Sequence, residues 1–292
     1  MLGSHRVYYE WKNMKTLYIS DMDGTLLQSD GTLSEYTKKK INEFYEKGVL
    51  FSVATARSFI SAEPLLKGTK FSVPIVLMNG VFVYDTEKNR AVKYHEIPIS
   101  SLKEILAAFY EHNLHPFMFL YGDNGKLSIK YTEFDNEMMI WFYNARVDML
   151  EGRFTKADDL TDIQIGQHPV YVNYFAPYEI LYPVAEKMKV IEGIGFAFYK
   201  DSYSDDWLIE IYSADASKTN GAKEVKEYAK AESIIAFGDN LNDILLLENA
   251  DCAVAVENAV GELKEIADTV IGDNNSDSVV KYIEQCENAT NS

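Results

Sequence analysis

The chain has 292 residues, and its 28 Lys+Arg against 45 Asp+Glu give a formal net charge of −17. This acidic excess argues against nucleic acid or an anionic membrane as the main partner, because both are recognised through basic side chains. With 47% hydrophobic and 25% charged residues, the composition is typical of a folded globular protein, and the length suggests about two domains.

Targeting signals and cysteines indicate where the protein works. The N-terminus lacks the apolar core of a signal peptide, and no segment is apolar over the length needed to cross a bilayer. Cys252 and Cys286 have no His or Cys partner at metal-ligand spacing, so we expect structural thiols and a reducing, cytoplasmic location. Met14 directly precedes the first predicted strand, so residues 1–13 are expected to be an N-terminal extension outside the fold.

The first and last parts of the chain alternate short apolar runs with amphipathic ones. Ser34 and Gly48 have the residue types that begin and end a helix. The predicted strands are 16–20, 49–54, 75–78, 234–237 and 253–256. The predicted helices are 34–47, a short one ending near 68, 218–230, 243–247, 260–267 and one from 277. This alternation predicts an α/β fold with a doubly wound parallel sheet covered on both faces.

Between these parts the pattern changes. Aromatic, alternating runs at 116–121, 170–175 and 195–199 are separated by helical stretches. We therefore expect a separate α+β domain inserted into the first, with most of its aromatic side chains filling its own core. The predicted domains are a core of residues 14–85 plus 201–286 and an insert of residues 86–200.

Polar residues follow several predicted strands at the edge where open α/β sheets bind ligands. Asp21 and Asp23 come directly after the first strand, and Thr55 follows the second. Asp239 follows the strand 234–237. An acidic pair after a strand can also cap a helix, but the residues after Asp23 lead into a turn, and the first helix begins well downstream.

Four short segments in this order resemble the motifs of the haloacid dehalogenase-like (HAD) superfamily. Asp21-Met22-Asp23-Gly24-Thr25 is similar to its first motif, and Val53-Ala54-Thr55-Ala56 is similar to its second. Lys218 stands where the lysine of the third motif would be. Gly238-Asp239-Asn240-Leu241-Asn242-Asp243 matches the fourth, Gly-Asp-x-x-Asn-Asp. The resemblance implies a Rossmann-like core domain.

The insert sharpens this resemblance. Its position between the second and third motifs resembles the type C2 cap, a lid domain of the superfamily. Leu77-Met78-Asn79-Gly80, just before the insert, is similar to the Cof-like sugar-phosphatase subfamily. The resemblance therefore implies a hydrolase acting on phosphoric monoesters.

The residues themselves support this chemistry. A carboxylate such as Asp21 can attack phosphorus to form an aspartyl-phosphate, which divides one difficult displacement into two easier ones. A second carboxylate, Asp23, can protonate the leaving oxygen and then activate water. An anionic nucleophile meeting an anionic phosphate needs a cation between them, and oxygen ligands suit Mg²⁺.

The resemblance also implies individual roles. The metal ligands would be the side chains of Asp21 and Asp239 and the backbone carbonyl of Asp23. Substrate binding and charge neutralisation would fall to Thr55, Ala56, Lys218 and Asn242, of which Thr55 and Lys218 also count as catalytic with Asp21 and Asp23. Asp243 would orient Lys218 or a metal-bound water from behind. Taken singly, Lys218 resembles a surface lysine, Thr55 a strand-end threonine and Asp239 a helix cap.

Two positions depart from the family pattern. Ala56 stands where the family commonly has Gly, and its methyl group adds bulk beside the predicted phosphate site. Glu257 likewise replaces a Gly of a subfamily string and brings a carboxylate to that loop. We expect a narrower entrance at Ala56 and retained activity, because the backbone amide remains.

The sequence thus predicts a Mg²⁺-dependent phosphatase that hydrolyses a small phosphomonoester, such as a sugar phosphate. A phosphomutase of phosphomannomutase type is an alternative, because it uses the same paired aspartates and a similar cap. A weakly catalytic sensor of a phosphorylated ligand is another. Asp23 argues against a dehalogenase or a pump-type ATPase. The expected partner is a small phosphorylated metabolite, and the sequence leaves the oligomeric state open.

Overall fold

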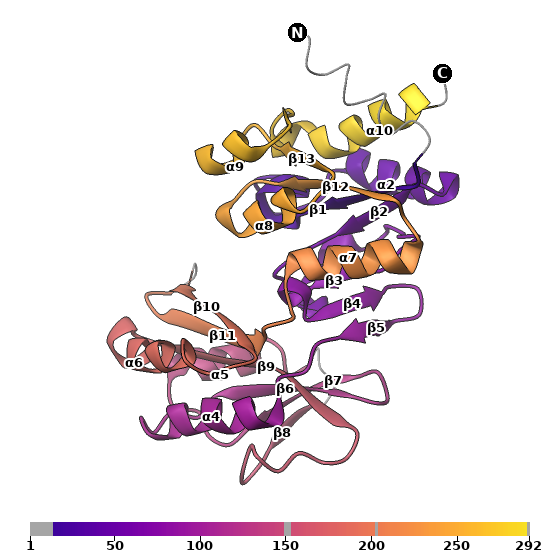
Figure 1. The fold of residues 1–292 in the computed structure, drawn as a ribbon. Helices are drawn as coiled ribbons and strands as arrows, with labels where there is room; N and C mark the ends of the chain where they lie inside the picture. The colour runs from indigo at the N-terminus through magenta and orange to yellow at the C-terminus, as the bar shows by residue number, and fades with distance from the viewer. Residues whose placement is uncertain (1–13, 149–152, 202–203, 291–292) are drawn as a thin grey trace. The chain divides into compact units, whose positions relative to one another are not determined.

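The computed structural model describes residues 14–148, 153–201 and 204–290 (Figure 1). They form two compact units: a core unit up to Lys93 and from Ser217 onward, and an inserted unit, Tyr94–Ala216. Both junctions lie later than the predicted 85/86 and 200/201. At the first, the strand Arg90–Tyr94 extends a sheet of the core unit. At the second, the strand Trp207–Ser213 pairs antiparallel with strands of the inserted unit. The predicted extension, residues 1–13, lies outside the described residues.

A five-stranded parallel sheet forms the centre of the core unit, in the order β14-β13-β12-β1-β2 (Figure 1). Its strands are β1 (Thr16–Ser20), β2 (Leu50–Val53), β12 (Ser233–Gly238), β13 (Cys252–Ala255) and β14 (Thr269–Val270). In β12 every residue is buried. Successive side chains of a strand point to opposite faces, so both faces of the sheet are covered. The predicted α/β fold with a doubly wound parallel sheet is confirmed.

Six helices of the described core unit flank this sheet. They are α2 (Glu35–Lys47), α3 (Phe59–Leu66), α7 (Lys218–Ala229), α8 (Ile244–Glu248), α9 (Gly261–Ile266) and α10 (Ser278–Thr290). As predicted, the Ser34 hydroxyl caps α2 by accepting a hydrogen bond from the Thr37 N–H, and Gly48 ends it with a φ of 72°. Across the described residues, each helix is too short or too polar to span a membrane.

The third predicted strand leaves the parallel sheet. β3 (Ile75–Leu77) is joined to the end of β2 by a single parallel bridge and continues into an antiparallel sheet with β4 (Phe82–Asp85) and β5 (Arg90–Tyr94). The turn η2 (Met78–Gly80) reverses the chain between β3 and β4. Its first two residues have φ values of 50° and 53°, which are uncommon for residues other than glycine.

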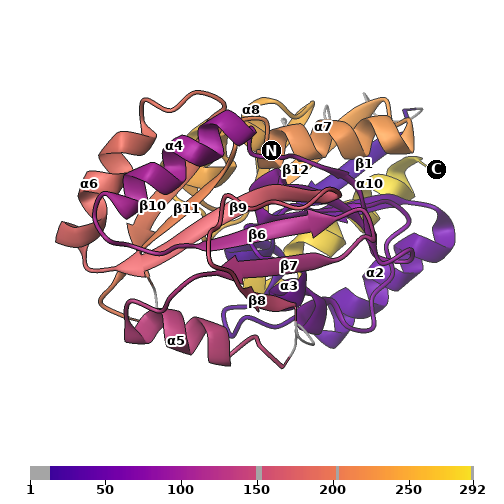
Figure 2. The same cartoon turned by 90° about the horizontal axis from the view of Figure 1, so that it is seen from below.

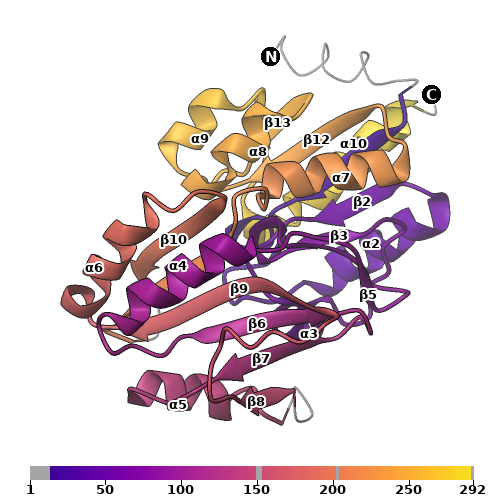
Figure 3. The ribbon, with the colours of Figure 1, turned by 60° about the horizontal axis from the view of Figure 1, so that its bottom comes forward.

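The inserted unit is built on a six-stranded sheet in the order β10-β11-β9-β6-β7-β8 (Figure 3). The strands are β6 (Phe117–Gly122), β7 (Leu127–Tyr131), β8 (Phe154–Lys156), β9 (Gln167–Ala176), β10 (Ile194–Lys200) and β11 (Trp207–Ser213). The described helices are α4 (Ile99–Tyr110), α5 (Glu137–Asn144) and α6 (Tyr178–Met188). All the pairings are antiparallel except that of β7 with β8, which is parallel.

Aromatic side chains hold helices to both faces of this sheet. Tyr174 of β9 packs on Phe109 of α4, with ring centroids 5.6 Å apart. Its neighbour Phe175 packs on Phe142 of α5 at 5.5 Å. Adjacent strand residues point to opposite faces, so α4 and α5 cover opposite sides of the sheet (Figure 2). These four rings are buried, as expected for core-filling aromatics.

Candidate active site

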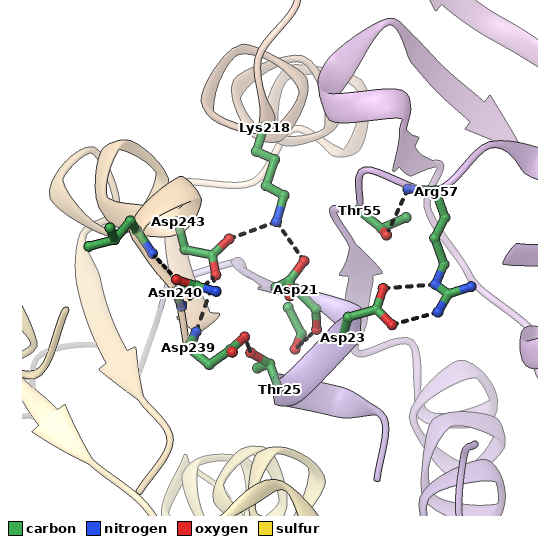
Figure 4. Close-up of polar contacts among 11 residues, drawn as sticks. Asp21, Asp23, Thr25, Thr55, Arg57, Lys218, Asp239, Asn240 and Asp243 are labelled. Atoms are coloured by element: carbon green, nitrogen blue, oxygen red, sulfur yellow. Dashed lines mark hydrogen bonds and ion pairs between the residues drawn. The ribbon is translucent and has the colours of Figure 1, made fainter. Parts of the chain in front are cut away.

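Three neighbouring parallel strands end together at one edge of the core sheet. β1 lies between β2 and β12, and the residues just beyond these strands include Asp21, Thr55 and Asp239 (Figure 4). The Asp21 N–H donates to the Phe237 carbonyl at 2.9 Å, which ties the end of β1 to β12. The edge predicted from the sequence pattern is therefore where the polar side chains gather.

A lysine links two of the site carboxylates. Lys218 Nζ donates to Asp21 Oδ1 at 2.6 Å and to Asp243 Oδ1 at 2.7 Å. The three residues are 5%, 6% and 0% exposed. Lys218 is the first residue of α7, whose start is fixed because the Ser217 hydroxyl accepts a hydrogen bond from the Asn220 N–H. Lys218 is thus a buried cation and not a surface lysine.

Burial and charge act against each other in this cluster. Burial raises the pKa of the Asp21 carboxyl, an effect that the Lys218 ammonium opposes and the Asp243 carboxylate reinforces. Burial lowers the pKa of Lys218, but attraction to the two carboxylates outweighs it, so the net pKa is raised. Lys218 therefore stays protonated and keeps a positive charge beside Asp21.

Asp239 is held by a different set of contacts. The Thr25 hydroxyl donates to Asp239 Oδ1 at 2.7 Å. Gly24 has a φ of +77°, which favours glycine, and a Cβ there would lie 2.4 Å from Asp239 Oδ2, so any side chain would displace that carboxylate. Asp243 Oδ2 accepts from the N–H groups of Asp239 and Asn240 at 3.2 and 3.3 Å. Asp243 therefore contacts both Lys218 and the turn that carries Asp239.

The acidic side chains of the site suit a divalent cation. Carboxylate oxygens of Asp21, Asp239 and Asp243 lie within 4.8 Å of one another. In the described part of the chain, the ion pairs of these three residues involve a single cationic side chain, that of Lys218. With all three carboxylates ionised, two negative charges are left over, and an all-oxygen set of this charge matches a hard divalent ion. Coordination by the Asp23 carbonyl stays a prediction.

Asp23 is paired with an arginine that sequence reasoning missed. Arg57 Nε donates to Asp23 Oδ2 at 2.7 Å, and Nη2 donates to Oδ1 at 2.6 Å (Figure 4). The Arg57 N–H also donates to Thr55 Oγ1 at 3.1 Å. The sequence position of Arg57 could have indicated it as a site residue. It is the only Lys or Arg between Gly48 and Lys67, and it lies two residues after the strand-end threonine.

The remaining predicted residues surround this cluster. Thr55 is fully buried, whereas Ala56 is exposed and its N–H has no hydrogen-bond partner among the described residues. Asn242 is exposed beside Asp243, where its side-chain amide is accessible to a ligand. Glu257, the second departure from the family pattern, is also exposed, so its carboxylate lies in solvent. Ala56 thus offers a free N–H donor to a ligand.

Comparison with known families identifies the class of protein. A family model described as haloacid dehalogenase-like hydrolase matches residues 18–283. The chain therefore belongs to this family and is a hydrolase, which confirms the resemblance inferred from the four motifs. The matched residues span both units, the core and the insert.

Individual relatives extend over nearly the whole chain. The protein is 26% identical to the 5-amino-6-(5-phospho-D-ribitylamino)uracil phosphatase YitU of Bacillus subtilis, over 91% of this chain and 95% of that protein. It is 25% identical to the pyridoxal phosphate phosphatase YbhA of Escherichia coli, over 90% and 95%. The crystal structure of TM0651 from Thermotoga maritima has the same fold, with a TM-score of 0.71 at 24% identity, over 92% and 96%.

Proposed function

We propose that this protein is a Mg²⁺-dependent phosphatase that hydrolyses small phosphomonoesters through an aspartyl-phosphate. The observation that carries the proposal is the contrast between two aspartates on one loop. Asp21 is buried and held by Lys218, as a nucleophile should be, whereas Asp23 is half-exposed, where it can exchange a proton with substrate and water.

The proposed reaction has two steps. First, a carboxylate oxygen of Asp21 attacks phosphorus, the bond to the ester oxygen breaks, and Asp23 gives its proton to the departing alcohol. Second, Asp23 takes a proton from water, whose oxygen attacks the same phosphorus and displaces the Asp21 carboxylate. Inorganic phosphate leaves, and both aspartates return to their starting state.

Other residues of the site would hold the phosphoryl group. The third N–H of the Lys218 ammonium, the Ala56 N–H and the Asn242 amide are the donors available for its oxygens. Asp21 and Asp239 would hold Mg²⁺, which would neutralise charge on the nucleophile and align the transferred group.

Small phosphorylated metabolites are the proposed substrate class. The two curated relatives are named for phosphatase activity on a phosphoribityl compound and on pyridoxal phosphate. Both names describe one phosphate on a compact organic molecule. A reducing, cytoplasmic location is also part of this proposal, because Cys252 and Cys286 are both free thiols.

Phosphate release tests the proposal. Intact protein is assayed on p-nitrophenyl phosphate and a panel of phosphorylated metabolites, with Mg²⁺ or EDTA. We expect Mg²⁺-dependent release that falls by more than about 10³-fold in Asp21→Asn, because the nucleophile is lost. Asp30→Asn, an exposed aspartate of the same loop region, is the matched control and should keep its activity.

Two other outcomes of the assay would favour a different function. Conversion of a sugar phosphate into its isomer, without net phosphate release, would favour the phosphomannomutase type of reaction. Tight binding of a panel compound without any turnover would favour a sensor.

A further inference from the structure

The geometry between Arg57 and Asp23 restricts the orientation of a carboxylate. Both Asp23 oxygens accept hydrogen bonds from the same guanidinium, at 2.6 and 2.7 Å (Figure 4). Two parallel N–H···O bonds fix the plane of the carboxylate as well as its distance. The Asp23 side chain is 51% exposed, so without this fork its carboxyl would be free to rotate in solvent.

Arg57 is itself anchored at its backbone. Its N–H donates to Thr55 Oγ1 at 3.1 Å, and its carbonyl accepts from the Met78 N–H at 3.0 Å. Thr55 in turn is fully buried, and its N–H donates to the Val76 carbonyl at 3.0 Å. The guanidinium therefore extends from a loop that is tied to residues 76–78 of the core unit.

The other cation of the site is already engaged. Lys218 Nζ lies between Asp21 and Asp243, and its side chain is only 4% exposed. A buried ammonium with two carboxylate partners has little freedom to orient a third. In the described site the two cations therefore pair with different aspartates. Lys218 contacts Asp21, the proposed nucleophile, and Arg57 contacts Asp23.

We propose that Arg57 is the positioning residue for Asp23, and that its fork directs this carboxyl toward the ester oxygen and the attacking water. This inference rests on the proposed function, in which Asp23 moves the protons. The competing role for a guanidinium here is direct binding of the substrate phosphate, because the same fork matches phosphate oxygens.

Leaving-group dependence separates the two roles. A p-nitrophenolate departs without a proton, whereas an alkoxide needs one from Asp23. We expect Arg57→Ala to lower kcat/KM about 10- to 100-fold on the fastest alkyl phosphate of the panel and less than about 3-fold on p-nitrophenyl phosphate. Arg57→Lys should rescue little, because one ammonium cannot hold both oxygens. Equal losses on both substrates, carried by KM, would overturn the inference in favour of phosphate binding.

A double-mutant cycle with Asp23→Asn gives an independent readout. If Arg57 acts only through Asp23, the double variant should hydrolyse p-nitrophenyl phosphate at the rate of Asp23→Asn alone. If the rate of the double variant instead falls by the product of the two single losses, Arg57 acts on the substrate and the inference is overturned.

The control is Arg90→Ala, which removes an exposed guanidinium from β5 of the core unit and should leave all rates unchanged. Unfolding midpoints check that each variant is folded. If Arg57→Ala does not fold, Arg57→Lys takes its place in the comparison. Lack of phosphate release by the unaltered protein would refute the proposed function. If the unaltered protein releases phosphate but the losses in the cycle multiply, only the role of Arg57 is refuted.

Discussion

Each unit of the molecule contains a cluster in which a basic side chain lies between two carboxylates, and the two clusters differ mainly in burial. In the core unit, Lys218 Nζ lies 2.6 Å from Asp21 and 2.7 Å from Asp243. The side chains of these three residues are 4%, 8% and 0% exposed. Little water can screen the charges, so each partner depends strongly on the others.

The cluster of the inserted unit has similar contacts in a different environment. The two ring nitrogens of His168 lie 2.9 Å from Glu96 and 2.9 Å from Asp123. The three side chains are 25%, 47% and 75% exposed. Distances alone would rank the clusters as near equals, but solvent screens the exposed one. The difference teaches that burial, and not contact distance, decides which cluster controls stability and chemistry.

Removing the buried cation should have the largest effect. Lys218→Met keeps the length of the side chain but leaves Asp21 and Asp243 without their charge partner. We expect phosphatase activity to fall by at least about 10²- to 10³-fold. The free energy of unfolding should fall by about 3–5 kcal/mol, because a buried pair has lost one member. Phosphate release and urea denaturation measure the two effects.

Lys223→Met is the matched control for this change. Lys223 is exposed on the same helix, α7, and its ammonium donates to Asn249 Oδ1 at 3.1 Å, an uncharged partner. Its substitution should change the unfolding free energy by less than about 0.5 kcal/mol. Similar losses in the two variants would contradict the importance of burial.

A smaller effect is expected from adding one methyl group beside Asp239. In Gly24→Ala the new Cβ would lie 2.4 Å from Asp239 Oδ2. The carboxylate must move, and we expect activity or Mg²⁺ affinity to fall about 10- to 100-fold. Backbone strain adds about 1–2 kcal/mol of destabilisation. Titration of activity against Mg²⁺ measures the first effect, and thermal unfolding measures the second.

Gly31→Ala separates strain from collision. Gly31 has nearly the same φ, +78° against +77°, but a Cβ added there would have no atom within 4 Å. This variant should lose similar stability and keep its Mg²⁺ dependence. If both variants lost activity equally, the close contact with Asp239 would not matter.

The core elements were predictable because parallel strands buried on both faces produce continuous apolar runs. The prediction of β1 as 16–20 is confirmed, and the polar residues after these runs identify the edge of the sheet. The departure of β3 into an antiparallel sheet was not predicted, although Asn79-Gly80 between two apolar runs is a recognised hairpin signal. The positive φ at Met78 is the part of this turn that residue preference does not indicate.

Long-range contacts were equally hidden. The fork between Arg57 and Asp23 joins residues 34 positions apart, and no local pattern specifies which carboxylate an arginine will meet. The second junction between the units was misplaced for a related reason. The strand β11 belongs with the inserted unit through its pairing with β9 and β10, and pairing partners do not appear in a strand's own sequence.

The smallest effect should come from the exposed cluster. Hydrogen bonding to Asp123 raises the pKa of His168 above its ordinary 6.5, and Glu96 adds to this. Because the folded pKa exceeds the unfolded one, the stabilisation is complete below about pH 6.5 and disappears as the pH rises through the folded value. His168→Gln should therefore lower the unfolding free energy by less than about 1 kcal/mol near pH 5.5, after screening, and leave it unchanged near pH 9.

Urea denaturation at both pH values measures the effect of His168→Gln, with the exposed His112→Gln as control. Added salt should shrink the difference between the two variants, because the charges of the exposed cluster are open to screening. A loss near 3–5 kcal/mol, the size expected for a buried pair, would mean that exposure does not weaken this cluster. That outcome would remove the contrast with Lys218.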